Sequence, residues 1–320
     1  MFRRSSVNKD HWGLFFIAPF VITFLIFTLY PIANTFWLAF TDSNLIHYRM
    51  RGEFIGLENF ERLMDTAMFW TAVTNTWRIW LSNFIPQMIL ALVLAAMFTS
   101  TTFKLKGTGF FKVMYYLPNL MMPVTIAALF SMFLDLHGPV NQFLVGTTGF
   151  MAEPRDFLSF TGDTRLTVIF LQTWLWFGQT AIVLVAGMTS ISPSFYESAL
   201  VDGASQVKMF FYITLPLLKP VLLFVLVTSL AGGMQMFEIP MLLTGPTGPP
   251  QNVVLTVNMF MNNLRVFPAG MIGLAAAVSV MLFFMSSFIT LILFRLFRES
   301  SDEREARKAA KKAKKQGGSV

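Results

Sequence analysis

The sequence predicts an all-α polytopic membrane protein with six transmembrane helices and both termini in the cytoplasm. Hydrophobic residues make up 55% of its 320 residues and charged residues only 13%, and the mean hydropathy is +0.60. Soluble domains are about one quarter charged. The apolar residues are gathered into six runs, each close to the roughly 20 residues that cross a bilayer as a helix.

The first run follows Arg3, Arg4 and Lys9 and is longer than the apolar core of a signal peptide, so we expect it to remain as an anchor, kinked at Tyr30-Pro31. The second run is interrupted by Pro86. The six predicted spans are Leu14–Phe40, Thr71–Phe98, Phe111–Leu134, Leu166–Met188, Val221–Leu243 and Met271–Phe294.

Between these spans, residues 41–69 are polar and end in Phe54-Ile55-Gly56-Leu57-Glu58-Asn59-Phe60, which predicts a small folded outer loop. A second outer loop covers residues 135–165, and a Gly/Pro-rich third lies around Gly245–Pro250. We therefore predict three regions. Residues 1–70 form the N-terminal tail, first helix and outer loop; residues 71–295 form a five-helix core with a cytoplasmic loop at 194–220; residues 296–320 form a basic cytoplasmic tail.

The positive charges fix the predicted orientation. Of the 24 Lys and Arg residues, 17 lie at the two termini and in the loops after the second and fourth spans. By the positive-inside rule these segments are cytoplasmic. The net charge of +7 arises mainly from the segment that begins at Arg295, which contains nine basic and four acidic residues. We assign that tail to lipid headgroups or solvent rather than to nucleic acid.

The stretch from Ser194 to Pro220 is too polar at its start for lipid, so it belongs at the water boundary. Its apolar residues recur at helical spacing on either side of Gly203, which predicts two short helices joined by a turn. Ser194 and Glu197 stand in the S-x-x-E spacing of a capping box at the first helix. Pro216 and Pro220 mark the start of the next span.

Within this stretch, Glu197-Ser198-Ala199, Gly203 and Ile213-Thr214-Leu215-Pro216 resemble the EAA motif of binding-protein-dependent ABC importer permeases. The family usually has alanine where Ser198 stands. The resemblance implies a type I ABC importer permease fold in which this coupling loop docks onto a cytoplasmic ABC ATPase dimer. Glu197 is either a capping residue or a docking residue. The implied coupling residues are Glu197, Ala199, Asp202, Gly203, Ile213, Leu215 and Pro216.

The N-terminal motifs are similar to those of MalF/UgpA-like carbohydrate permeases: Leu14-Phe15-Phe16-Ile17-Ala18-Pro19-Phe20, and Gly56-Leu57-Glu58-Asn59-Phe60. So are Tyr116-Leu117-Pro118 and Gly138-Pro139-Val140-Asn141. This resemblance implies a multi-pass protein of the cell membrane that forms half of a path for a sugar or sugar derivative. Its implied partners are a second, MalG-like permease and an extracytoplasmic solute-binding protein.

The residues themselves indicate a transport subunit without an enzyme activity or cofactor of its own. The chain has no cysteine, and its three histidines lie far apart. Gly107-Thr108-Gly109-Phe110-Phe111-Lys112 lacks the spacing of a P-loop, so ATP and Mg²⁺ belong on the partner ATPase. The alternatives are a stand-alone ion-coupled secondary carrier and an importer permease for a non-sugar solute such as glycerol phosphate.

Polar residues in the fourth and fifth spans predict the substrate site, because membrane-buried polar groups face a cavity or another helix. Gln172 and Gln179 lie two turns apart with Trp176 between them, and a sugar binds to amides beside an aromatic ring. The alternative is that the glutamines form interhelical bonds, that Gly232-Gly233 is a packing notch, and that Glu238 pairs with Arg265. The predicted lining residues are Gln172, Leu175, Trp176, Gln179, Ser229, Gly232, Gly233, Gln235 and Glu238.

The orientation can be tested by labelling single cysteines, because the native chain has none. The charge distribution places Lys104, Lys208 and the tail in the cytoplasm and Glu153 outside. In intact cells, an impermeant maleimide should label Glu153→Cys, whereas Lys208→Cys should react only after permeabilisation. The reverse pattern would overturn the six-span topology.

Overall fold

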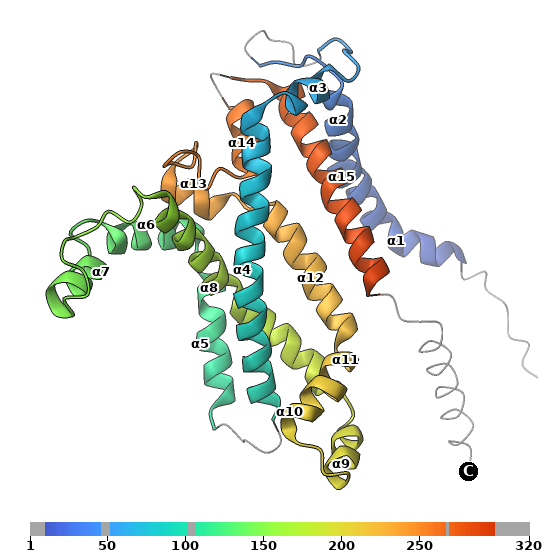
Figure 1. The fold of residues 1–320 in the computed structure, drawn as a ribbon. Helices are drawn as coiled ribbons and strands as arrows, with labels where there is room; N and C mark the ends of the chain where they lie inside the picture. The colour runs from blue at the N-terminus through green and yellow to red at the C-terminus, as the bar shows by residue number, and fades with distance from the viewer. Residues whose placement is uncertain (1–9, 46–51, 101–105, 267–268, 298–320) are drawn as a thin grey trace, which may run out of the picture. The chain divides into compact units, whose positions relative to one another are not determined.

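The computed structural model describes residues 10–45, 52–100, 106–266 and 269–297 (Figure 1). Lys104 and the tail from Arg298 onward lie outside these residues. Six helical stretches are long and apolar enough to cross a membrane, which confirms the predicted number of spans. They are Phe15–Ala39, Ala67–Thr99, Pro123–Thr147, Thr161–Thr189, Lys219–Thr244 and Ile272–Leu296.

The first span is helical throughout but changes its hydrogen-bonding pattern along its length. It consists of α1 (Asp10–Phe24), a π-helical turn η1 (Leu25–Leu29) and α2 (Tyr30–Ala39). Pro31 has no N–H to donate to the carbonyl of Phe27, four residues earlier, so a regular ladder cannot continue through this point. The irregular turn therefore lies directly before Tyr30-Pro31, where the sequence predicts a kink.

The described chain divides into two compact units, the first formed by the described residues of 10–73 and 257–284, which are 10–45, 52–73, 257–266 and 269–284. It contains α1 to α3 (Glu58–Met64), the start of α4 (Ala67–Thr99), α14 (Val257–Arg265) and the first half of α15 (Ile272–Leu296). Asn59 is buried, and its side-chain amide donates to the carbonyls of Ala39 at 3.0 Å and Thr41 at 2.8 Å. These bonds confirm that the segment ending in Gly56–Phe60 is a folded loop.

The second unit is formed by the described residues 74–100, 106–256 and 285–297. Its large helices are the rest of α4, α5 (Thr108–Leu120), α6 (Pro123–Leu134), α8 (Thr161–Thr189), α12 (Lys219–Met234) and α13 (Glu238–Thr244). In this unit α5 and α12 pack against α8, while α6 packs against α13 (Figure 1). The predicted division of the chain at residues 70 and 295 stays a prediction.

Two of the predicted spans are each broken into two helices. The predicted third span, Phe111–Leu134, is α5 and α6 separated by extended backbone at Met121 and Met122. Met122 precedes Pro123, whose ring disfavours the helical conformation of the residue before it. The predicted fifth span, Val221–Leu243, is α12 and α13 separated at Gln235–Phe237. In sequence, both breaks read as continuous apolar runs.

The connection between α6 and α8 is held by Asn141, which lies at the end of α7 (Pro139–Asn141) before a π-helical turn η2 (Gln142–Thr147). The candidate span Pro123–Thr147 thus extends beyond Leu134, where the sequence predicted the third span to end. The buried amide of Asn141 donates to the carbonyls of Asp135 and Arg155 at 2.9 and 2.8 Å. Its side-chain oxygen accepts the N–H of Arg155 at 2.9 Å. The Gly-Pro-Val-Asn segment therefore closes this connection on itself.

Candidate functional site: the coupling stretch and the polar helix faces

The stretch between α8 and α12 folds as the predicted pair of short helices. It contains α9 (Pro193–Val201), α10 (Gln206–Met209), a π-helical turn η3 (Phe210–Thr214) and α11 (Leu215–Leu217). In Figure 1, α9 and α10 lie at the end of the second unit where α4 ends and α5 begins.

Gly203 terminates α9 in a left-handed conformation, with φ +74°. The N–H of Ala204 donates to the carbonyl of Ala199 at 2.9 Å, and the N–H of Gly203 donates to that of Leu200 at 3.0 Å. This pair of bonds is the Schellman motif, which favours glycine because a Cβ is strained there. A Cβ at Gly203 would contact nothing within 4 Å. The turn itself therefore requires the glycine.

The predicted capping box does not form. Proline supplies a helical φ in advance, so α9 begins two residues earlier, with Pro193 at its first position and Ser192 as the N-cap. Ser194 lies inside the helix, and its hydroxyl bonds that of Ser192 at 2.9 Å. Glu197 is exposed and has no hydrogen bond or ion pair with the described part of the chain. Its carboxylate is available to a partner.

A buried contact fixes the two halves of the stretch to each other. The hydroxyls of Tyr196 in α9 and Thr214 in η3 lie 2.9 Å apart, and Thr214 and Met209 are buried. The opposite surface is apolar and open: Val201 is 87% exposed, and Phe195, Leu200, Val207, Phe211 and Tyr212 are also exposed. Among the predicted coupling residues, Glu197, Asp202, Gly203 and Pro216 are exposed, and Ala199, Ile213 and Leu215 are half-buried.

The predicted substrate residues on α8 separate into packed and exposed members. Gln172 is only 8% exposed, and its side-chain oxygen accepts the indole N–H of Trp176 at 3.2 Å. Leu175 is buried in the apolar core. Trp176 is 45% exposed, and Gln179 is exposed as well. The ring and the second glutamine are therefore accessible on the surface of this chain.

The predicted residues on α12 and α13 separate in the same way. The indole N–H of Trp80 donates to the carbonyl of Ser229 at 2.9 Å and lies 3.2 Å from its hydroxyl. Gly233 is buried, and a Cβ there would collide with the Trp80 ring. Gly232, Gln235 and Glu238 are exposed, and a Cβ at Gly232 would meet nothing within 4 Å. Ser229 and Gly233 thus form a helix-packing notch.

The sequence analysis missed the part of α4 that these residues contact. Thr76, Trp80, Asn83 and Gln87 recur at three- and four-residue spacing in this apolar helix, and all four are buried. The amide of Gln87 donates to the hydroxyl of Thr180 at 2.8 Å, and the hydroxyl of Thr173 donates to the carbonyl of Asn83 at 3.3 Å. This spacing of polar residues is a signal of helix pairing that the sequence carries.

Residues 79–298 match the family described as binding-protein-dependent transport system inner membrane component. The chain belongs to this family of ABC importer permeases. It is a transport subunit rather than an enzyme, and a multi-pass protein of the inner membrane.

The chain is similar to a lactose transport system permease protein, LacF, of Rhizobium radiobacter. The two are 34% identical over 267 residues, which cover 82% of this chain and 86% of LacF.

The fold is similar to a bacterial ABC transporter involved in the import of the acidic polysaccharide alginate. The TM-score is 0.75 at 25% identity, covering 92% of this chain and 97% of the other. That transporter in complex with alginate pentasaccharide-bound periplasmic protein gives a TM-score of 0.74 at 26% identity, covering 92% and 98%.

Adjacent glycines on α12 provide a test of the packing notch. Gly233→Ala should lower stability by about 1–3 kcal/mol, because the added methyl group displaces the buried Trp80 ring. Gly232→Ala should keep or raise stability, since its site is open and alanine favours helix. Thermal denaturation of both variants in one detergent measures this difference. Equal melting temperatures of the two variants would contradict the assignment of Gly233 to a packing notch.

Proposed function

We propose that this chain forms half of the translocation pathway for a sugar or sugar derivative. An extracytoplasmic solute-binding protein delivers the solute, and a second, MalG-like permease supplies the other half. A cytoplasmic ABC ATPase dimer binds ATP and Mg²⁺ and docks on residues 194–220. One observation supports this docking most directly. Tyr196 and Thr214 bond to each other within the stretch, whereas its apolar surface and the carboxylate of Glu197 are exposed.

The relatives support a sugar as the solute. LacF is named for lactose, and the alginate importer for an acidic polysaccharide. Exposed groups on this chain supply what a sugar needs: amides at Gln179 and Gln235 that exchange hydrogen bonds with hydroxyl groups, and the Trp176 ring that stacks on an apolar sugar face. Family membership leaves no support for a stand-alone ion-coupled carrier. Glycerol phosphate remains the alternative solute.

We assign substrate contact to the exposed members of the predicted set: Trp176, Gln179, Gly232, Gln235 and Glu238. The packed members of the set hold these helices in place: Gln172, Leu175, Ser229 and Gly233. Trp176 is held by the buried Gln172, whose side-chain oxygen accepts its indole N–H. Helix α12, which carries Gly232, is held against α4 by the bond from Trp80 to Ser229. A preorganised wall reduces the entropy lost when a solute binds.

The coupling surface can be tested at Val201, because Gly203 is needed for the turn. Val201→Glu places a charge on the exposed apolar surface and should reduce copurification of the ATPase by about tenfold or more, as expected for a central interface residue. Phe150→Glu makes the same change at an exposed residue of the outer loop. It should leave ATPase association intact. Normal copurification of the ATPase with the Val201→Glu variant would contradict this docking surface.

Two glutamines on one helix separate substrate contact from packing. Gln179→Ala should weaken uptake about threefold to tenfold through a lost neutral hydrogen bond of roughly 0.5–1.5 kcal/mol, with an unchanged melting temperature. Gln172→Ala should instead lower the melting temperature, because it leaves the partly buried indole N–H of Trp176 unpaired. Uptake of several sugars and of glycerol phosphate, measured beside thermal stability, checks both. If Gln179→Ala changed the melting temperature but not the preference among these solutes, Gln179 would be a packing residue and not a substrate contact.

A further inference from the structure

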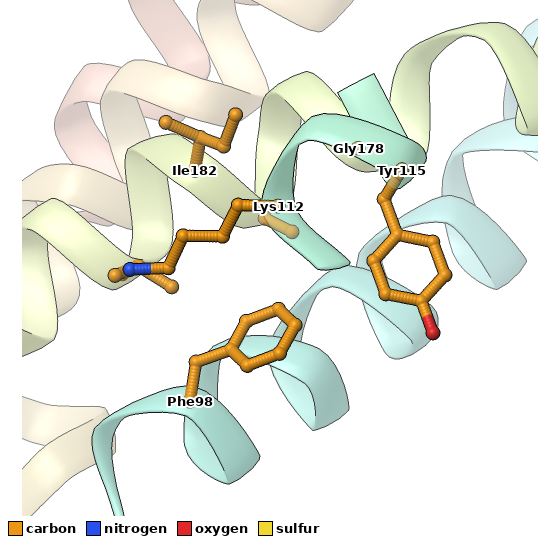
Figure 2. A pocket seen from close by; sticks show the side chains of 7 residues that line it. Phe98, Lys112, Tyr115, Gly178 and Ile182 are labelled. Atoms are coloured by element: carbon orange, nitrogen blue, oxygen red, sulfur yellow. The ribbon is translucent and has the colours of Figure 1, made fainter. Parts of the chain in front are cut away.

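A crevice outside the proposed sugar and coupling sites lies where α4, α5 and α8 diverge (Figure 2). Helices α5 and α8 meet at Gly178, where a Cβ would collide with the carbonyl of Tyr115. Beyond this contact the helices leave a shallow crevice that encloses only about 10 Å³. Apart from Gly178, its lining residues are Phe98, Lys112, Tyr115, Ala181, Ile182 and Val185.

Lys112 is the one charged residue of this apolar lining. It is half-buried, and its ammonium group lies 5.9 Å from the centre of the Phe98 ring. Figure 2 shows its side chain between Phe98 and Ile182, with the Tyr115 hydroxyl pointing away. The ring attracts the cation but does not neutralise it.

The surrounding chain offers this cation no carboxylate. There is no Asp or Glu from Thr66 to Leu134, which covers α4 from its start through α6, and none from Thr164 to Tyr196, which covers the rest of α8. Within the described ranges Lys112 makes no ion pair. A half-buried charge in a membrane protein requires a counter-charge. Lys106 lies exposed just before α5, so the positive charge extends from the crevice toward solvent.

The size of the crevice and its position restrict what binds there. Ligand pockets measure roughly 300–1,000 Å³, whereas this crevice has room for about one water molecule, so neither a sugar nor an acyl chain enters it. An acyl chain can instead lie across its mouth, against the exposed side chain of Ile182. Lys112 lies about one turn inside the start of α5, a depth at which lysines reach toward lipid phosphates. Exposed apolar residues of α5, including Phe110, Val113 and Met114, face outward beside it.

We propose that this crevice binds an anionic phospholipid of the leaflet on the lysine-rich side. The lipid phosphate pairs with the ammonium group of Lys112, and one acyl chain lies across the mouth of the crevice against the exposed side chain of Ile182. The lipid thereby supplies the counter-charge that the neighbouring helices lack.

Native mass spectrometry of the purified, delipidated complex tests this proposal. Phosphatidylglycerol and phosphatidylcholine with identical acyl chains are titrated separately. Lys112→Gln should weaken phosphatidylglycerol binding about fivefold, equivalent to about 1 kcal/mol for one lysine at a lipid surface, and leave phosphatidylcholine binding unchanged. Lys112→Arg should retain most of the binding. Ile182→Glu keeps Lys112 but places a negative charge where the acyl chain would lie, so it should also reduce binding.

Lys106→Gln is the matched control, because it removes a nearby positive charge outside the crevice. An equal loss of phosphatidylglycerol binding in Lys106→Gln would mean a diffuse attraction of the lipid to the charged surface, which would overturn the site. Unchanged binding in Lys112→Gln would also overturn it. Displacement of the lipid by inorganic phosphate would identify a free-anion site instead. The readout is lipid bound rather than solute moved, so its failure and a failure of the proposed transport function are distinguishable.

Discussion

Polar groups inside a bilayer have no water to bond, so each must find its partner within the protein. The second unit is organised by this constraint. Gln87 bonds Thr180, Thr173 bonds the carbonyl of Asn83, and Trp80 bonds Ser229. These contacts join α4 to α8 and α12 between two apolar clusters, one around Leu171 and one around Leu184. Apolar packing alone distinguishes poorly between helix partners in lipid, whereas a polar pair specifies register.

Close approach of helix backbones is the second condition that this arrangement requires. Gly178 brings α8 against the backbone of α5, and Gly233 makes room on α12 for the indole ring of Trp80. A larger residue at either place would separate the helices and stretch the polar bonds beside them. Small and polar residues therefore act together: the first sets the distance between helices, and the second sets their alignment.

At the membrane boundary the constraint is reversed, because water is present and helix ends can be satisfied locally. Residues 193–217 use a Schellman turn at Gly203 and the Tyr196–Thr214 contact to hold their shape. A stretch fixed by its own contacts can transmit force from a partner to the spans on either side of it. Its exposed apolar residues are then free to serve as the contact surface.

The sequence by itself determined the class of fold, the number of spans, the helix–turn–helix of residues 194–220 and the presence of a small folded loop ending at Phe60. Each follows from a local property: run length, periodicity, or a glycine with positive φ. It also singled out Gln172, Trp176, Gln179 and the α12 residues as polar groups in lipid. Only the tertiary structure decided which of these are packed and which are accessible. The identity of a residue states its capacity to form hydrogen bonds, but its partner lies on another helix. The break after α5 and the start of α9 lie beside Pro123 and Pro193, so the sequence does carry a signal for both. The break after α12 at Gln235–Phe237 is visible only in the structure.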